Sequence, residues 1–381
     1  MSYQKYNVTH TPYGGGSTTN ITTAVDIRSD EGVEAKTDTW KLRVLKKSLG
    51  SLDIQLEDNI KIYMGGSTAG DIVMDGLVKE TDYVIAIEGR YLMLKGVNKL
   101  ESLLTNPMPC AFSKADVKAP GGVGWVASEA IKYLIDHVNS FNTMSDNWVN
   151  MGTGEVVATT KHIDYYSEYK PVFQHIEELS NDDYTDNGQY VMYLDTSNNL
   201  VWKPRPTVTS GTLTEGANDI LGMTIQRGTW DTINYIIVNC GNDLLGHKIT
   251  NYSTNLQSIG KIGFKGKYVA KPEIAKNYIA THISADNDGV RTGTRAWGKV
   301  WGDMIVKLLG GARHKAKIEV RGNKSYGKGD LWTIAPNDYT FSNGASTYNM
   351  RLVQVTHNFS IGGWTTTLNF EEDEDTALAN L

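Results

Sequence analysis

Short runs of alternating apolar and polar residues dominate the N-terminal part of the chain. "WKLRVLKK" places Trp40, Leu42 and Val44 on one face, and "NIKIYMGG" alternates in the same way before it ends in Gly-Gly. "GDIVMDGLVKETDYVIAIEGR" indicates two strands joined near residues 80–82. Period-two alternation bounded by Gly, Asp and Asn is typical of strands and hairpins. The spacing of these strands predicts a small barrel or sandwich over residues 21–105.

The periodicity changes after a segment rich in Pro and Gly, "NPMPCAFSKADVKAPGGVGW", which marks a domain boundary. Apolar residues at 3–4 spacing predict a helix over residues 127–138. "KPVFQHIEELS" predicts a second helix with Pro171 at its first position, where the missing N–H is harmless. "QYVMYLDTSNNLVWKPR" then predicts a hairpin with its loop at 196–199. Together these elements predict an α+β middle domain over residues 106–205.

The C-terminal half returns to β patterns, such as "DTINYIIVNCG", but it is interrupted by a helical stretch. In "TRAWGKVWGDMIVKLLGG" an apolar stripe at 3–4 spacing predicts a helix that faces a core and stops at Gly310–Gly311. The stripe consists of Trp297, Val300, Trp301, Met304, Ile305 and Leu308. We therefore expect a second barrel built from residues 206–244 and 316–372, with an α+β subdomain inserted at 245–315.

Two alternating runs around a Gly-Gly turn close this second sheet in "MRLVQVTHNFSIGGWTTTLNF". Such a hairpin is the expected last strand pair of a sheet. Its apolar faces predict residues that lie in the core or contact another subunit. These are Val353, Val355, His357 and Phe359 on the first strand and Trp364, Leu368 and Phe370 on the second.

The two ends of the chain are polar. Residues 1–20 are Gly-rich and predict a flexible or docking arm, and residues 373–381 form an acidic C-terminal tail. The run Glu371, Glu372, Asp373, Glu374 and Asp375 is either a solubilising segment or a negative rim or lumen segment of a symmetric assembly. The predicted fold class is mainly β with α+β insertions, comprising two small tube-like β-barrel domains, a middle domain and an inserted subdomain.

Length and charge narrow the classes of function. The 381 residues suit several domains, and the formal net charge of −6 argues against a surface devoted to nucleic-acid binding. No run approaches the roughly 18 apolar residues of a membrane span, and no signal peptide is visible, so we expect folding in a cytoplasm. Cys110 and Cys240 lie in no CxxC arrangement, which favours two buried free thiols.

Motifs that carry catalysis or bind ligands are missing from the chain. "PGGVGWVASEAI" lacks the Lys-Ser or Lys-Thr of a phosphate-binding loop, and "ADNDGV" and "NDDYTDNGQY" lack the closing Glu of a calcium loop. The eight histidines form no HExxH pair, and no GxSxG elbow occurs. We therefore expect no catalytic residue, no cofactor and no metal, and a protein that is not an enzyme.

The order of the parts resembles the baseplate hub proteins of contractile-tailed phages. The same arrangement is similar to the N-terminal part of type VI secretion spike proteins and to the tail-associated hub proteins of siphophages. "KIEVRGNKSYGKGDLWTI" and "RLVQVTHNFSIGGWTTTLNF" resemble the last strands of that family, and "EDNIKIYMGG" and "DIVMDGLVKETDY" its first tube-like domain. "SEAIKYLIDHV" and "GQYVMYLDTSNNLVWKPR" resemble its middle domain.

The resemblance implies a structural role in a virion tail assembled in the host cytoplasm. It implies a homotrimer whose six barrel modules join a six-fold tail tube or distal tail protein to a three-fold central spike protein. Further implied partners are the tape measure protein and other baseplate components, and DNA would pass through without specific binding. Two other functions stay open, namely a glycan-binding or receptor-binding tail protein and a tail-associated cell-wall hydrolase.

Overall fold

The computed structural model describes residues 6–372 and divides the chain into two compact units. Outside the described residues lie 1–5, 14, 22–23, 33–37, 117–118, 123, 143–150, 181–183, 187, 218, 230–231, 283, 312, 342–343, 361 and 373–381. Unit 1 comprises residues 1–223, 317–338 and 351–370. Unit 2 comprises residues 224–316, 339–350 and 371–381. The acidic tail at 373–381 lies outside the described residues. Of the predicted arm at 1–20, Tyr6–Thr11 and Thr19–Asn20 form strands.

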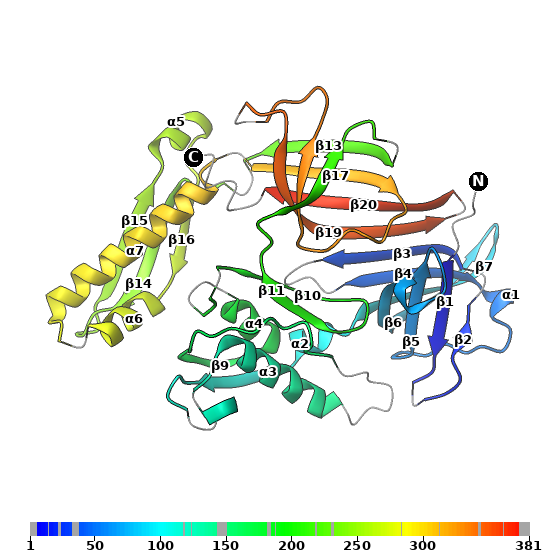
Figure 1. Cartoon of the computed structure of the whole chain (residues 1–381), viewed down its shortest axis with the longest axis horizontal. Helices are drawn as coiled ribbons and strands as arrows, with labels where there is room; N and C mark the ends of the chain where they lie inside the picture. The colour runs from blue at the N-terminus through cyan, green and yellow to red at the C-terminus, as the bar shows by residue number, and fades with distance from the viewer. Residues whose placement is uncertain are drawn as a thin grey trace. The chain divides into compact units, whose positions relative to one another are not determined.

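A large sheet, most of whose residues belong to unit 1, forms the framework of the fold (Figure 1). In the described part of the chain it has 13 strands, and the main path runs β13-β17-β20-β19-β3-β4-β7-β6-β5-β1-β2. Off this path, β18 pairs with β19, and β12 pairs with β18. The strands are β1 (Tyr6–Thr11), β2 (Thr19–Asn20), β3 (Ala24–Gly32), β4 (Thr39–Leu45), β5 (Asn59–Met64), β6 (Ile72–Ala86), β7 (Gly89–Asn98), β12 (Thr209–Thr214), β13 (Ile220–Gly228), β17 (Arg313–Arg321), β18 (Leu331–Ala335), β19 (Tyr348–Ser360) and β20 (Gly363–Glu372). A short helix, α1 (Lys46–Leu49), follows β4.

The strands of the two predicted barrels meet within this sheet at one antiparallel pair. β19 pairs with β3, from Gln354 opposite Gly32 to Phe359 opposite Ile27. Figure 1 shows β19 running beside β3, with the remaining C-terminal strands on one side and the N-terminal strands on the other. Buried side chains of the N-terminal strands form one apolar cluster, which includes Trp40 and Leu42.

One predicted turn is replaced by a continuous strand. The sequence predicts two strands joined near residues 80–82, but β6 runs through this segment without a break. Its register against β7 shifts between Val78 and Glu80, as in a β-bulge. The chain reverses only after Ala86, where Ala86 pairs with Gly89. The polar residues that suggested a turn instead lie on an exposed strand, where Lys95 forms ion pairs with Glu80 and Asp82.

The middle segment packs three helices against two pairs of strands. These elements are α2 (Glu101–Thr105), β8 (Pro107–Phe112), α3 (Ala127–Asn142), β9 (Tyr165–Pro171), α4 (Val172–Leu179), β10 (Tyr190–Leu194) and β11 (Leu200–Pro204). The apolar stripe of α3 is buried in one core together with the inner face of α4 and with Trp202 of β11. The predicted helices and the predicted hairpin are thus present, and Pro171 stands immediately before α4 as its N-cap residue.

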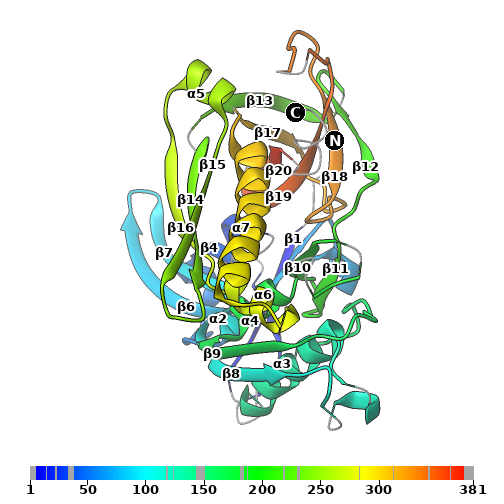
Figure 2. The ribbon, with the colours of Figure 1, turned by 90° about the vertical axis from the view of Figure 1, so that its left-hand side faces the viewer.

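Unit 2 is built around a three-stranded sheet in the order β15-β14-β16. Its elements are β14 (Tyr235–Asn242), β15 (Lys248–Thr254), α5 (Leu256–Ile262), β16 (Gly266–Ala270), α6 (Glu273–Thr281) and α7 (Asn287–Leu309). Figure 2 shows the long helix α7 lying along this sheet. The sequence places residues 235–242 in the second barrel, whereas they form the central strand of this smaller sheet. That correction moves the start of the insertion toward the N-terminus.

The prediction that the apolar stripe of α7 faces a core is wrong for much of the stripe. Trp297, Val300 and Met304 are 40%, 71% and 43% exposed. The face turned toward the sheet instead follows an i, i+4 row, Val290, Thr294, Gly298, Gly302 and Val306. Two glycines allow this close approach, since a Cβ at Gly298 would lie only 2.3 Å from Sγ of Cys240.

The predicted fold class is confirmed, because strands dominate and the helices gather in the middle segment and in unit 2. The division into six sequence segments, apart from the placement of β14, stays a prediction. Among the described residues, no helix is both long and apolar enough to cross a lipid bilayer.

Candidate functional site

The closing hairpin of β19 and β20 carries the residues that the sequence singles out. Figure 1 shows the two strands as the red pair that lies next to β3. Val355, His357, Trp364, Leu368 and Phe370 are buried, and Val353 and Phe359 are half-buried. The assignment of these side chains to a core or to a subunit contact stays a prediction, because only one chain is present.

Trp364 belongs to the apolar cluster of the N-terminal strands. Its indole lies against Gly322, where an added Cβ would come within 2.1 Å of the ring. The N–H of Gly322 also donates a 2.9 Å hydrogen bond to the carbonyl oxygen of Trp364. Only glycine fits at position 322 beside this ring, so the end of β17 and the start of β20 are fixed together.

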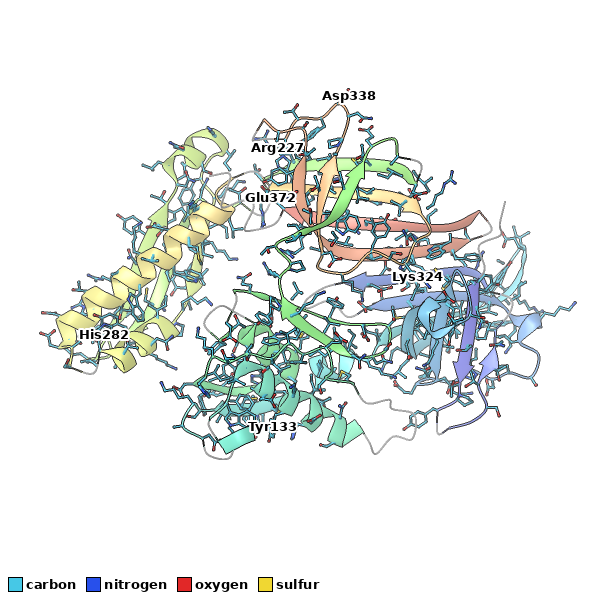
Figure 3. The ribbon with its side chains drawn as sticks, viewed as in Figure 1. Tyr133, Arg227, His282, Lys324, Asp338 and Glu372 are labelled. Carbon is cyan, nitrogen blue, oxygen red and sulfur yellow. The ribbon has the colours of Figure 1, made fainter. Side chains whose placement is uncertain are left out.

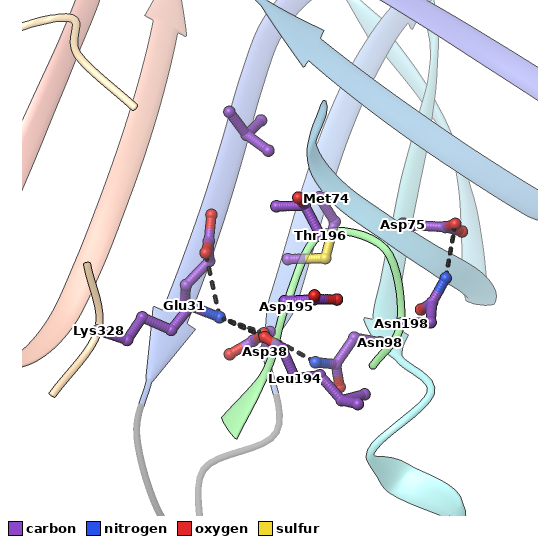
Figure 4. Close-up of a pocket in the computed structure, with 11 residues that line it drawn as sticks. Glu31, Asp38, Met74, Asp75, Asn98, Leu194, Asp195, Thr196, Asn198 and Lys328 are labelled. Carbon is purple, nitrogen blue, oxygen red and sulfur yellow. Dashed lines mark hydrogen bonds and ion pairs between the residues drawn. The ribbon is translucent and has the colours of Figure 1, made fainter. Parts of the chain in front are cut away.

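A buried lysine lies at the centre of the charged groups in unit 1. Lys328 stands in the loop between β17 and β18, in the segment "GNKSYGKGD". Its Nζ lies 2.8 Å from a carboxylate oxygen of Asp38 and 3.1 Å from one of Glu31. It also donates a 3.3 Å hydrogen bond to the carbonyl oxygen of Leu194. Figure 4 shows the ammonium group between the two carboxylates.

These contacts bring together three segments that are far apart in the sequence. Glu31 lies on β3 and Asp38 just before β4, Leu194 ends β10, and Lys328 precedes β18. The predicted first barrel and middle domain therefore supply the partners of one ammonium group that comes from the predicted second barrel. We call Glu31, Asp38, Lys328 and His357 the ionic junction.

The electrostatics of the ionic junction follow from its burial. Removal from water disfavours the charged form of Lys328, but the two carboxylates outweigh this and raise the pKa of its ammonium group. Burial raises the pKa of Asp38 to about 6, although Lys328 pulls it down. The backbone N–H of Gly32 and the side-chain amide of Asn98 donate hydrogen bonds of 2.8 and 2.7 Å to Asp38. These donors compensate the buried carboxylate in part.

His357 completes the junction from β19. Its Nε2 lies 3.6 Å from a carboxylate oxygen of Glu31, and its Nδ1 lies 3.0 Å from the hydroxyl of Thr366 on β20. Burial and, secondarily, the charge of Lys328 lower the pKa of His357 to about 3. The imidazole is therefore neutral at neutral pH and acts as a hydrogen-bonding group rather than as a cation.

A second polar contact ties the β10–β11 loop to β6. Asp75 accepts hydrogen bonds from the side-chain amides of Asn59 at 2.7 Å and Asn198 at 2.8 Å. Asn198 holds a left-handed backbone with φ of 62°, a conformation that asparagine tolerates better than most residues. Figure 4 shows this bond close to the ionic junction.

The space between these groups is too small for a substrate. The cavity lined by Glu31, Asp38, Asp75, Asn198 and Lys328 has a volume of about 10 Å³, which is room for a single water molecule. Among the described residues, no cluster of His, Cys, Asp and Glu could hold a metal ion. The site therefore fixes segments of the fold together, and it offers no room for a chemical reaction on a ligand.

The acidic residues after β20 are partly described. Glu371 forms a 3.2 Å ion pair with Lys315. Glu372, labelled in Figure 3, accepts a 3.0 Å hydrogen bond from the N–H of His314 and another from the hydroxyl of Tyr348. Burial opposes its ionisation, but these hydrogen bonds lower the pKa of Glu372 below its ordinary value. Asp373, Glu374 and Asp375 lie outside the described residues.

Sequence reasoning missed the members of the ionic junction other than His357. Glu31, Asp38 and Lys328 look like ordinary polar residues of turns and strand ends, and only the fold brings them together. The one available signal was the loop "GKGD", where Gly329 has φ of +76° and an added Cβ would lie 3.4 Å from Val191 of β10. A glycine in such a conformation marks a loop that approaches another element closely.

Comparison with solved structures identifies the fold. The tail protein of Neisseria meningitidis MC58 aligns with a TM-score of 0.61 and 14% identity over 98% of both chains. The 43 kDa tail protein of prophage MuSo2 from Shewanella oneidensis aligns at 0.60 and 11%, over 97% of this chain and 99% of that one. Prophage tail protein gp18 from Listeria monocytogenes EGD-e aligns at 0.50 and 11%, over 98% and 97%.

Comparison of the sequence itself gave no match, either to a protein-family model or to a curated protein. The structural matches show that this chain has the fold of phage tail proteins along nearly its whole length. The resemblance to tail-hub proteins that the sequence predicts is thus confirmed at the level of the fold.

Proposed function

We propose that the chain is a structural hub protein of a tailed-phage-like particle. In this proposal three copies form a ring in the tail baseplate, which joins a six-fold tail tube or distal tail protein to a three-fold central spike protein. Other baseplate components surround the ring, and the particle is assembled in the host cytoplasm. The observation that carries the proposal is the fold shared with tail proteins over at least 97% of this chain and of each compared chain.

The small volume of the buried polar cluster in unit 1 fits a structural role. The buried polar cluster of unit 1 encloses only about 10 Å³, and it consists of ion pairs and hydrogen bonds between distant segments. Such a cluster specifies one arrangement of the segments it joins, since each group needs its partners. A hub that transmits force between a tube and a spike needs that kind of internal rigidity.

An open strand edge supports assembly into a ring. β5 pairs with β6 only over residues 72–77, and beyond that point β6 pairs with β7 alone in the described structure. On the open part of β6 and the turn after it, Ile85 is 71% exposed and Ile87 is fully exposed. An apolar edge strand is a template for pairing with another chain, and closed rings remove such edges.

The channel of this ring would guide the tape measure protein and DNA. The net charge of −6 gives the chain an overall negative field. A negative wall repels phosphate and lets DNA pass without specific binding. In this proposal the acidic run at 371–375 lies at the lumen or rim of the ring.

The mass of the purified protein in solution tests the proposal. Light scattering after size-exclusion chromatography should give three times the chain mass of 42.1 kDa, and negative-stain images should show rings with a central hole. Dilution into the nanomolar range separates a stable trimer from a weak one. A single-chain mass at every concentration, with no ring in the images, would contradict the proposal.

A glycan-binding or receptor-binding tail protein is the second candidate. One observation favours this candidate. The sequence predicts that Trp297 faces a core, but Trp297 is exposed on α7 and forms a ring cluster with Tyr278 and His282. Figure 3 labels His282 in this cluster. Exposed aromatic rings can serve as platforms for sugars. Quenching of tryptophan fluorescence by cell-wall glycans, lost in Trp297→Ala, would support this alternative.

A further inference from the structure

The helix α7 covers one face of the three-stranded sheet of unit 2. Ile236, Val238 and Cys240 of β14 and Ile249 of β15 are fully buried on the side where α7 packs. The small residues of α7 make this contact close, since a Cβ at Gly302 would lie 2.6 Å from Oγ of Ser253. Figure 2 shows α7 on this side of the strands. The helix therefore shields the apolar side chains of this face from water.

The opposite face of the same sheet carries aromatic rings in the open. Ile237 is opposite Tyr252 on one side and Tyr268 on the other, so these three side chains share one face. Tyr252 and Tyr268 are 60% and 58% exposed, and Phe264, just before β16, is 63% exposed. Tyr235 lies between them, with ring centroids 6.1 Å from Tyr252 and 5.2 Å from Phe264. We call Tyr235, Ile237, Tyr252, Phe264 and Tyr268 the aromatic face.

The charge around the aromatic face differs from that of the rest of the chain. Residues 224–316 contain thirteen Lys and Arg against six Asp and Glu, a formal charge of +7. The remaining residues contain 24 Lys and Arg against 37 Asp and Glu, a formal charge of −13. The strands β14, β15 and β16 and the helix α5 hold no acidic residue, whereas Lys248, Lys261, Lys265 and Lys267 lie on them or between them and are exposed.

We propose that the aromatic face is an interface that docks on an acidic surface of a second copy of this chain. The chain itself carries both complementary charges, so a head-to-tail contact pairs a basic patch with an acidic one. Aromatic side chains supply the apolar area that an interface needs at its centre, and the lysines around them steer the approach. This inference rests on the proposed function, because it names the surface through which copies of a ring would meet.

Two double variants and a matched control test the inference. Tyr252→Ser with Tyr268→Ser removes exposed rings, and Lys248→Glu with Lys265→Glu reverses exposed charge. Lys276→Glu with Lys307→Glu makes the same charge change on α6 and α7, away from the aromatic face. The association constant, measured by analytical ultracentrifugation, should fall by about tenfold or more in the two face variants. The control should associate like the wild type apart from a small, salt-dependent decrease.

The position of the contact is tested by cross-linking. A photoreactive phenylalanine analogue placed at Tyr252 should join two chains covalently, and the cross-linked product should run at twice the chain mass. Cross-links that stay within one chain would overturn the proposal. A labelled thymidine oligonucleotide tests whether the aromatic face binds nucleic acid instead. If the oligonucleotide binds the wild type but not the tyrosine variants, and the solution mass of the variants is unchanged, the proposal is overturned.

The remaining outcomes separate this inference from the proposed function. If the wild type is trimeric and both face variants stay trimeric with unchanged association, the aromatic face is not the interface, and the hub proposal stands. If the wild type is a single chain at all concentrations, the hub proposal itself fails. Loss of association in the face variants alone, with native circular dichroism retained, supports the inference.

Discussion

The charge state of each residue in the ionic junction depends on its neighbours. Lys328 stays protonated because two carboxylates face it, and Glu31 and Asp38 stay compatible with burial because the ammonium group lies between them. His357 contributes no charge near neutrality, since burial lowers its pKa to about 3. The junction is therefore a coupled set, and the loss of one member leaves the others buried without compensation.

Lys328→Met should destabilise unit 1 strongly. The variant leaves two carboxylates buried without their cation, and breaking a buried ion pair from one side costs about 3–5 kcal/mol. The double variant Lys328→Met with Asp38→Asn should recover part of that loss, because it removes one of the stranded charges. Urea unfolding followed by tryptophan fluorescence measures both effects. Lys324→Met is the control, since Lys324 pairs with Asp71 at the surface and should change stability little; equal losses in both lysine variants would contradict this account.

His357 should make the fold less stable in acid. Between its ordinary value of 6.5 and about 3, the unfolded chain binds a proton that the folded chain excludes, so the free energy of unfolding decreases as the pH falls. Asp38 acts in the opposite direction between 3.8 and about 6, where the folded chain holds more protons than the unfolded one.

His357→Gln should therefore flatten the loss of stability between pH 6.5 and pH 4, and Asp38→Asn should steepen it. Urea unfolding midpoints measured across this range at constant ionic strength test both variants. The opposite signs expected for the two variants guard against a general effect of mutation. Identical slopes in the wild type and in His357→Gln would show that the imidazole does not titrate with folding.

At the scale of elements, the sequence predicted what local patterns determine. The closing hairpin, the 190–204 hairpin and the helices α3 and α4 follow from period and turn chemistry, and they are present. β6 was divided wrongly because Glu80–Asp82 has the composition of a turn. In the structure these polar residues are extended, because they pair with β7. The ionic junction could not be predicted, since no local pattern places Lys328 beside Glu31 and Asp38.

The helix α7 shows the same limit in another form. An apolar stripe at 3–4 spacing predicts a buried face, but α7 presents Gly298 and Gly302 to its sheet and leaves Val300 in solvent. Small residues permit close packing of the helix backbone on the strands. This packing is more favourable here than burial of the larger side chains on another face of the helix. Spacing identified the helix correctly, whereas the choice of face depended on the shape of its partner.

Gly298→Ala should destabilise unit 2 although alanine favours helices. The added Cβ would lie 2.3 Å from Sγ of Cys240, and overpacking of this kind costs about 1–3 kcal/mol. Gly260→Ala in α5 is the matched control, because no atom lies within 4 Å of its added Cβ and the change should stabilise by about 0.5–1 kcal/mol. The labelling rate of the buried Cys240 thiol under native conditions reports on unit 2 and should rise only in Gly298→Ala. Faster labelling in both variants would point away from the packing explanation.

At the scale of the whole molecule, charge and open surface are divided unevenly along the chain. The basic charge is concentrated in residues 224–316, and the acidic charge lies elsewhere. Two kinds of exposed apolar surface coexist with this division, the aromatic face on unit 2 and the open edge of β6 in unit 1. A monomer gains nothing from either surface, whereas a closed assembly of copies can cover both.

Ile85→Lys combined with Ile87→Lys should prevent assembly without unfolding the chain. Both side chains are exposed in the single chain, so the substitutions should leave the free energy of unfolding nearly unchanged. Charged residues on an edge strand block the pairing of that edge with another chain, so the trimer that we propose should give way to single chains. Thr81→Lys with Glu88→Lys is the comparison, because it adds charge on the same hairpin without removing an apolar side chain. Light scattering at matched concentrations measures the mass of each variant, and a full trimer in the isoleucine variant would remove the edge of β6 from the assembly interface.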